Sequence, residues 1–366
     1  MFGNIYKGKK VLVTGHTGFK GSWLSLWLLK LGAKVVGYSN DIPTNPSIFT
    51  DLNLGDKIID YRGDIRDLDS LNKVISSEKP DFIFHLAAQP IVSESYSDPI
   101  GTITTNAIGT MNIMECLRKI NWHCSVVLIT SDKSYENVEW VWGYKETDPL
   151  GGKDIYSGSK GAAELIIKSY YHSFFEGHEN DVRIAVARAG NVIGGGDWAK
   201  DRIVVDCMKA WSDGKSVEIR CPDATRPWQH VLEPLSGYLT LGQMIAHSDI
   251  LLGEAFNFGP RSEQNRTVVE LLNDLFNHTD VGNAEVAFNV TDNIPFKESG
   301  LLKLNCDKAL FYLKWEAALD YINTVKFTGD WYTSYFANNT DNYKFTVNQI
   351  TQYEEIAKEK KLIWAS

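Results

Sequence analysis

The sequence is poor in cysteine. Its 366 residues include five cysteines, which are scattered and form no CxxC pair. An odd number without paired spacing argues against a disulfide framework, and neither the cysteines nor the histidines have the spacing of metal ligands. We therefore expect no metal site and reduced, mostly buried thiols. The five are Cys116, Cys124, Cys207, Cys221 and Cys306.

The sequence also lacks long apolar runs, basic clusters and repeats. No apolar run approaches the length of a membrane span, and no signal segment precedes the strand-like run that begins at Val11. A net charge of −9 without any Lys/Arg-rich run argues against a nucleic-acid or anionic-membrane partner. We expect a cytoplasmic protein that binds a small molecule. The acidic balance still leaves room for a local basic pocket that accepts phosphate groups.

What the first half does contain is an alternation of short apolar runs with helical periodicity. One predicted helix, Lys20–Leu31, has Trp and Leu at core-facing spacing and stops at Gly32, a residue typical of helix C-caps. Short apolar runs between helices are typical of strands buried on both faces of a parallel sheet. The predicted fold class is α/β, with a Rossmann-type doubly wound parallel sheet. The expected strands are Val11–Val13, Val35–Tyr38, Phe82–Leu86, Val126–Ile129 and Ile184–Ala187.

A glycine-rich turn follows the first strand. The run Gly15-His16-Thr17-Gly18-Phe19-Lys20-Gly21 lies between that strand and a helix, as a dinucleotide-binding fingerprint requires. Glycines there let the backbone turn and approach a pyrophosphate, which helix N-terminal N–H groups would bind. The GxxGxxG spacing resembles the short-chain dehydrogenase/reductase superfamily. The predicted cofactor contacts in this turn are Gly15, Thr17, Gly18, Phe19 and Gly21.

The end of the second strand bears on which dinucleotide binds. Ser39 and Asn40 occupy the place where an acidic ribose-binding residue is expected, and Asp41 comes slightly late. No arginine lies nearby in the sequence to accept a ribose phosphate, so NAD is favoured over NADP. Two later strand ends supply further predicted cofactor contacts, although both also read as ordinary turns. These contacts are Asp64, Ile65, Leu86, Ala87, Ala88 and Gln89.

From about Gly194 the pattern loosens into shorter elements rich in Gly, Pro, Trp and Asp. We expect residues 1–193 to form the NAD-binding domain. Residues 194–366 should form mainly a smaller mixed α/β substrate-binding domain, with some segments returning to the sheet.

A tyrosine and a lysine lie four residues apart in the sequence, which is about one helical turn. Tyr156 and Lys160 would project from one helix face, close to Ser131 at the end of the Val126–Ile129 strand. Lys160 and a positive nicotinamide ring would favour the phenolate and lower the pKa of Tyr156 towards neutrality. A tyrosine with an ordinary pKa of about 10 would be an ineffective base at pH 7. These two residues are also expected to contact the cofactor.

Three longer blocks resemble one family closely. They are Ser131–Lys133, Asp154–Leu165 and Ala187–Trp198, and they look like the branch of the nucleotide-sugar 4,6-dehydratases that acts on CDP-glucose. These enzymes are extended short-chain dehydrogenase/reductases, and the resemblance covers nearly the whole chain. Most relatives have Thr-Asp-Glu where this chain has Ser131-Asp132-Lys133, and that departure matches the CDP-glucose branch.

The resemblance implies a dehydration with no net redox change. Tyr156 would deprotonate the sugar 4-hydroxyl, Lys133 would remove the proton at carbon 5, and Asp132 would protonate the departing 6-hydroxyl. The product would be CDP-4-dehydro-6-deoxy-glucose, used for 3,6-dideoxyhexoses of surface lipopolysaccharide. Lysine is a base at pH 7 only if its pKa is lowered, so Lys133 could instead only position Asp132 or the substrate.

Substrate phosphates need cations or oriented amides, and several such residues follow the fifth strand. Arg188 fits a structural ion pair equally well. The predicted substrate contacts are Gln89, Ser131, Asn191, Arg202 and Arg226, with Arg220 in the same region. The family also pairs through two long helices, here around Pro99–Lys119 and Asp154–Phe175, so we expect a homodimer or homotetramer.

Three alternatives stay open at this stage. A nucleotide-sugar 4-epimerase shares the fold, NAD and the Tyr/Lys pair but needs no acid–base pair at 132–133. A 4,6-dehydratase for another nucleotide differs only in base recognition, which the residues alone do not identify. A non-enzymatic dinucleotide sensor would not need Tyr156, Lys160 and Asp132 together.

Overall fold

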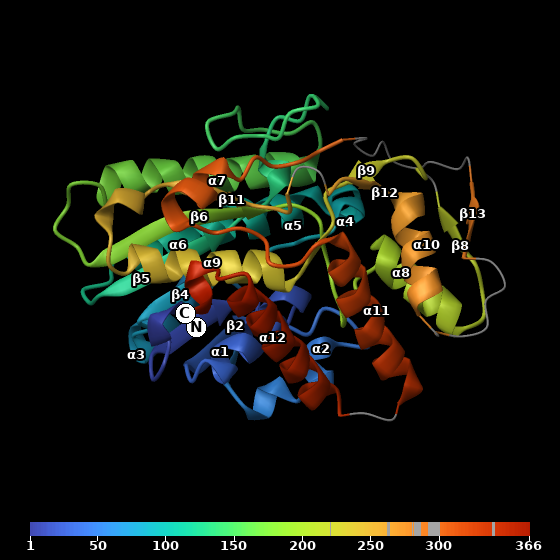
Figure 1. Cartoon of the computed structure of the whole chain (residues 1–366). Helices are drawn as coiled ribbons and strands as arrows, with labels where there is room; N and C mark the ends of the chain where they lie inside the picture. The colour runs from blue at the N-terminus through green and yellow to red at the C-terminus, as the bar shows by residue number, and fades with distance from the viewer. Residues whose placement is uncertain (220, 262–263, 280, 282–286, 292–300, 339–340) are drawn as a thin grey trace.

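A seven-stranded parallel sheet forms the centre of the protein in the computed structural model (Figure 1). The structure describes residues 1–366 except 220, 262–263, 280, 282–286, 292–300 and 339–340. The strand order is β11-β6-β5-β4-β1-β2-β3, which confirms the doubly wound α/β prediction. The strands are β1 (Lys10–Thr14), β2 (Lys34–Ser39), β3 (Ile59–Arg62), β4 (Phe82–His85), β5 (Cys124–Ile129), β6 (Val182–Ala189) and β11 (Ala255–Phe258).

Alternate residues of each strand pack against opposite helical layers. In β1, Val11 and Val13 belong to one apolar cluster and Leu12 belongs to the other. The first cluster includes α1 (Phe19–Lys30) and α9 (Leu232–Ile245), and the second includes α3 (Leu68–Glu78), α6 (Gly109–Leu117) and α7 (Ile155–Phe174). A sheet covered on both faces explains why its strands read as continuous apolar runs.

The helix predictions for the first half hold, with one irregularity. Trp23 and Trp27 of α1 are completely buried, as core packing requires, and Gly32 after the helix has a φ of +80°. The predicted Pro99–Lys119 helix is α5 (Pro99–Ile103), a π-helical stretch over Thr104–Ile108, and α6. The remaining short helices of this half are α2 (Ile48–Asp51) and α4 (Val92–Ser97).

The second half both completes the sheet and builds a separate group of elements. Strand β11 pairs in parallel with β6 at the sheet edge. At one end of the molecule, α8 (Ile203–Ser212) and α10 (Val268–His278) lie beside β8 (Val217–Ile219) and β13 (Phe288–Val290) (Figure 1). Two-residue strands link this region: β7 (Val192–Ile193) with β10 (Gln229–His230), and β9 (Thr225–Arg226) with β12 (Arg266–Thr267). The division at residue 193/194 stays a prediction.

Two long helices form the C-terminal end of the chain, and the second of them packs against α1. They are α11 (Tyr321–Ala337) and α12 (Asn342–Glu359). Glu354 of α12 accepts a hydrogen bond from the Trp27 indole at 2.9 Å and pairs with Lys30. Helix α1 is therefore partly covered by α12, which comes from the other end of the chain.

Candidate active site

The turn between β1 and α1 is tight enough to admit only glycine at two positions. A Cβ at Gly15, where φ is +73°, would lie 2.8 Å from the Ala87 backbone, and a Cβ at Gly21 would lie 2.1 Å from the Gly15 carbonyl oxygen. Gly18 is the N-cap of α1 and provides no side chain to bind the first N–H groups of that helix. This cradle fits a dinucleotide pyrophosphate, since the helix N-terminus can donate to its oxygens.

The ribose end of the cradle is held by polar contacts. Thr17 Oγ1 donates to the Asp41 carbonyl oxygen at 2.6 Å, and His16 lies between Ser39 Oγ (3.0 Å) and Asp60 Oδ1 (2.9 Å). The sequence reading that no arginine lies nearby is wrong, because parallel pairing of β2 and β3 sets Arg62 opposite Ser39. The Arg62 guanidinium pairs with Asp60 at 2.7 Å, so it is already neutralised.

Asp64 and Ile65, two of the predicted cofactor contacts, bind other parts of the protein. The Asp64 carboxylate pairs with Arg66, whose hydrogen bonds hold the pKa of Asp64 below its usual value. Ile65 is 4% exposed, and its side chain packs against Gly109, while its carbonyl oxygen accepts from Asn112 at 3.0 Å. Contact between these two residues and a cofactor stays a prediction.

The strand end at Leu86–Gln89 closes the other side of the cradle. The N–H groups of Leu86 and Ala87 donate to the Thr14 carbonyl oxygen (3.1 Å) and Thr14 Oγ1 (3.2 Å). The Gln89 amide donates to Thr102 Oγ1 at 2.7 Å and accepts from the Ile91 N–H. Both ends of the Gln89 side chain are thus engaged within the protein, and its contact with substrate stays a prediction.

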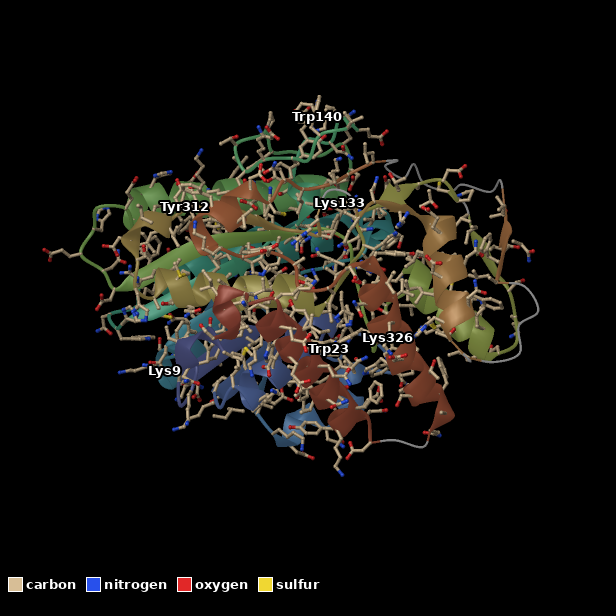
Figure 2. The ribbon with its side chains drawn as sticks, in the orientation of Figure 1. Lys9, Trp23, Lys133, Trp140, Tyr312 and Lys326 are labelled. Carbon is tan, nitrogen blue, oxygen red and sulfur yellow. The ribbon has the colours of Figure 1, made fainter. Side chains whose placement is uncertain are left out.

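The Ser131–Lys133 turn follows β5 directly. Ser131 Oγ donates to Asp132 Oδ1 at 2.9 Å and accepts from the Lys133 N–H at 3.2 Å. Asp132 is 4% exposed, and Lys133 is half-buried near the middle of the molecule (Figure 2). The turn therefore fixes an acid that is shielded from solvent next to a hydroxyl and an amine.

Tyr156 and Lys160 lie on the first turns of α7, where Asp154 caps the helix by accepting from the Ser157 N–H. Both side chains are 7% exposed, and Lys160 Nζ is 5.9 Å from the Tyr156 ring centroid. Burial raises the pKa of Tyr156 to about 12, although Arg202 and a hydrogen bond with Ser131 act to lower it. Burial therefore dominates among the protein's own groups, and the lowering expected from Lys160 together with a bound nicotinamide ring stays a prediction.

Two lysines, Lys160 and Lys20, lie close enough to interact through their charges. Burial and the nearby Lys20 ammonium lower the pKa of Lys160 to about 8. Burial and Arg202 likewise lower the pKa of Lys20 to about 8, while Asp132 and Asp197 raise it. Lys20 was not among the residues predicted for the site. The available signal was a charged side chain on the first turn of an otherwise apolar helix.

A buried ion pair fixes the catalytic segments relative to one another. Arg188 of β6 binds Glu164 of α7 through two bonds (Nε–Oε1 2.7 Å, Nη2–Oε2 2.9 Å) and donates to Tyr135 Oη at 2.7 Å. Thr130, just before Ser131, donates to the same carboxylate, and Tyr135 donates to Asn257 Oδ1 at 2.8 Å. The structural interpretation of Arg188 is confirmed, since these contacts join β5, β6, α7 and β11.

The predicted phosphate-binding cations Arg202 and Arg226 both contact backbone carbonyl oxygens. Arg202 at the start of α8 is half-buried and its Nη2 is 3.5 Å from the Pro90 carbonyl oxygen. Arg226 is 8% exposed and donates to the Thr225 carbonyl oxygen at 2.9 Å. Asn191 is half-buried after β6, and Arg220 lies outside the described residues. Their contacts with substrate stay predictions.

The described part of the chain contains no group of three or more His, Cys, Asp or Glu side chains arranged to hold a metal ion. None of the helices in the same residues is both long and apolar enough to span a membrane.

Comparison with known proteins places this geometry in a family. The chain is 47% identical over 315 residues to a CDP-glucose 4,6-dehydratase of Salmonella typhimurium, covering 85% of this chain and 87% of that protein. Among solved structures, the epimerase Mth375 of Methanothermobacter thermautotrophicus matches with a TM-score of 0.77 at 23% identity, covering 92% of this chain and 97% of the other.

A dTDP-glucose 4,6-dehydratase of Bacillus anthracis, solved in complex with NAD, matches with a TM-score of 0.72 at 22% identity and covers 93% and 100% of the two chains. The family described as GDP-mannose 4,6 dehydratase matches residues 12–326. Because that match spans most of the sequence, the chain belongs to the GDP-mannose 4,6 dehydratase family.

Proposed function

We propose that the chain is an NAD-dependent CDP-glucose 4,6-dehydratase. The observation that carries this proposal is the Ser131-Asp132-Lys133 turn with its buried acid, because the Ser131 hydroxyl hydrogen-bonds to Tyr156 and also donates to Asp132. The 47% identity to a CDP-glucose 4,6-dehydratase supports the choice of nucleotide. A 4-epimerase shares the tyrosine and lysine but has no use for a buried acid beside them. A non-enzymatic dinucleotide sensor would not need Tyr156, Lys160 and Asp132 together.

The cofactor would be held by the glycine cradle between β1 and α1 and by the strand end at Ala87. When bound there, NAD would supply the hydride chemistry, which is acceptance from carbon 4 of the sugar and return to carbon 6. The protein supplies the proton movements. Tyr156 accepts the proton of the 4-hydroxyl, and the Ser131 hydroxyl positions that hydroxyl. The positive charges of Lys160 and Arg202 favour the phenolate that this step requires.

The elimination needs an acid at oxygen 6 and a base at carbon 5. The 4-ketone makes the carbon 5 proton acidic, and we assign its removal to Lys133 and protonation of the leaving oxygen to Asp132. Burial of Asp132 suits this role because a shielded acid delivers its proton to the substrate and not to bulk water. If Lys133 only positions Asp132, another group must take the carbon 5 proton.

The test is direct. Purified protein with NAD is incubated with CDP-glucose, and the nucleotide sugars are resolved by mass spectrometry. The expected product is lighter than the substrate by one water, with no net change in NADH absorbance. Parallel reactions with the dTDP-, UDP- and GDP-glucose compounds test the nucleotide. Absence of a dehydrated product from all four would refute the proposal, and a 4-epimer would favour the epimerase.

We also propose self-association through the α5–α6 and α7 surface, in a cytoplasmic enzyme of 3,6-dideoxyhexose formation. Apolar side chains face outward there: Ile100 on α5 is 75% exposed and Leu165 on α7 is 54% exposed. Packing these helices against their counterparts would bury such side chains in a four-helix contact. Leu165→Glu should lower the mass measured by light scattering, and an unchanged mass would argue against this surface.

A further inference from the structure

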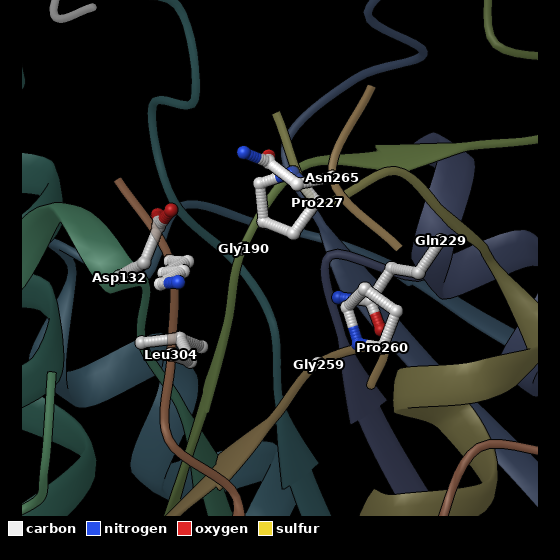
Figure 3. A pocket seen from close by; sticks show the side chains of 9 residues that line it. Asp132, Gly190, Pro227, Gln229, Gly259, Pro260, Asn265 and Leu304 are labelled. Carbon is white, nitrogen blue, oxygen red and sulfur yellow. The ribbon is translucent and has the colours of Figure 1, made fainter. Parts of the chain in front are cut away.

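A small pocket opens on the Asp132 carboxylate (Figure 3). Its walls come from segments that are distant in the sequence: Gly190 after β6, Gln229 of β10, Asn265 before β12, and Lys303. The approach to Asp132 is close, because a Cβ at Gly190 would lie 3.2 Å from Asp132 Oδ2. Asp132, the proposed acid, thus forms part of the pocket wall.

Lys303 is held so that its side chain faces this pocket. Its neighbours Leu302 and Leu304 are 2% and 7% exposed and pack with Tyr135 and Tyr144. The Lys303 carbonyl oxygen accepts from the Tyr144 N–H at 2.9 Å, which fixes the backbone. Both leucines belong to this apolar cluster, and Lys303 and Leu304 line the pocket.

Gln229 contributes a buried acceptor without a donor. Its side chain is 1% exposed, and Nε2 donates to the Phe258 carbonyl oxygen at 3.2 Å, which fixes the orientation of the amide. Oε1 has no hydrogen-bond partner among the described residues, and the same is true of Asn265 Oδ1. A buried acceptor of this kind needs a donor from a ligand or from water.

The pocket thus combines a carboxyl group, an ammonium and two acceptors. A hydroxyl group matches this set, because its oxygen accepts from an ammonium while its O–H donates to an amide oxygen. A phosphate does not match, because it would bring negative charge against Asp132 and has no proton for Gln229.

We propose that Lys303 and Gln229 bind the carbon 6 hydroxyl of the sugar and hold it against Asp132 until it leaves as water. This inference rests on the proposed function, in which Asp132 protonates that oxygen. In the step, the carbon 5–hydrogen bond breaks towards the base and its electron pair forms the carbon 5–carbon 6 double bond. The carbon 6–oxygen bond breaks, and the Asp132 proton completes the water. Lys303 donates a hydrogen bond and loses no proton, so it is a positioning residue.

The experiment measures selectivity for the carbon 6 oxygen. Binding of CDP-glucose, CDP-6-deoxy-glucose and CDP to the NAD-loaded protein is followed by titration calorimetry, with Tyr156→Phe as a background that stops turnover. A hydrogen bond to a charged donor should favour CDP-glucose over CDP-6-deoxy-glucose by about 10- to 100-fold. Lys303→Met should reduce that ratio to less than about threefold and leave CDP binding unchanged.

Matched variants keep the result interpretable. Lys326→Met removes an exposed lysine of α11, remote from Lys133 (Figure 2), and should leave the full ratio. Gln229→Leu should lower the ratio independently, and Lys303→Arg should restore part of it. Equal weakening of all three ligands by Lys303→Met would overturn the inference and assign Lys303 to the diphosphate. An unchanged ratio in both Lys303→Met and Gln229→Leu would also overturn it. Failure of the parent enzyme to dehydrate CDP-glucose would instead remove the proposed function.

Discussion

The Arg188–Glu164 pair should be far more sensitive to loss of one partner than to loss of both. Arg188 is 3% exposed and donates to Glu164 and Tyr135, so Arg188→Met leaves a buried carboxylate without its main partner. Breaking a buried pair from one side costs about 3–5 kcal/mol in the free energy of unfolding. Replacing both partners with apolar groups of similar size removes the stranded charge, so the double variant Arg188→Met/Glu164→Leu should recover at least half of that loss.

The expected shift in melting temperature follows from the size of the protein. With an unfolding entropy of about 2.1 cal/mol/K per residue, a chain of 366 residues changes its Tm by roughly 1.3 °C per kcal/mol. Arg188→Met should therefore lower the Tm by about 4–7 °C in differential scanning calorimetry at one fixed scan rate.

Arg261→Met is the matched control for this measurement. Arg261 pairs with Glu316 on the surface, where its side chain is 57% exposed, and such a pair is worth less than about 1 kcal/mol. Its Tm should stay within about 1 °C of the parent. The reasoning is refuted if Arg188→Met behaves like this control, or if the double variant is as unstable as the sum of the single variants.

Three further predictions concern the cofactor cradle, the elimination and a buried carboxyl group. Gly21→Ala should weaken NAD binding more than tenfold, because its Cβ would lie 2.1 Å from the Gly15 carbonyl oxygen; unchanged affinity in fluorescence titration contradicts this. Lys133→Met should abolish exchange of the carbon 5 hydrogen with solvent, whereas Asp132→Asn should retain that exchange without elimination. Mass spectrometry of reactions in D₂O measures the exchange. Exchange at the native rate in Lys133→Met would exclude the base role of Lys133. Burial raises the pKa of Glu233 from 4.5 to about 7, above its unfolded value, so the stability it contributes is present at low pH and lost as pH rises through about 7. Glu233→Gln should therefore gain about 1–3 kcal/mol relative to the parent between pH 5 and pH 7.5, and a difference independent of pH in chemical unfolding speaks against this.

Much of the sheet and its cofactor turn could be predicted because their signals are local. The apolar runs at Val11–Val13 and Val126–Ile129 lie within β1 and β5, and helix α1 ends at Lys30 before Gly32. Strand period, glycine placement and helix capping involve neighbouring residues only, so the sequence contains them. The Ser131–Lys133 turn was found for the same reason, since it follows a strand directly.

The parts that were missed depend on contacts between distant segments. Arg62 came next to Ser39 only when β3 paired with β2, and the carboxamide of Gln89 turned out to be engaged by Thr102. Lys303 lines the Asp132 pocket because its backbone is hydrogen-bonded to the distant Tyr144, and no local pattern indicates that contact. Burial of Tyr156, which outweighs the lowering of its pKa by Arg202, likewise depends on the folded protein and not on a local pattern.

The wall of the Asp132 pocket has a consequence for changing specificity. The acid itself follows β5, whereas Gln229, Asn265 and Lys303 come from separate segments beyond residue 226. The groups that move protons and the groups that face the outgoing oxygen are therefore encoded in different stretches of the gene. Randomising codons 229, 265 and 303 alone offers a compact library for altering the accepted sugar while the nucleotide cradle and proton donors stay intact.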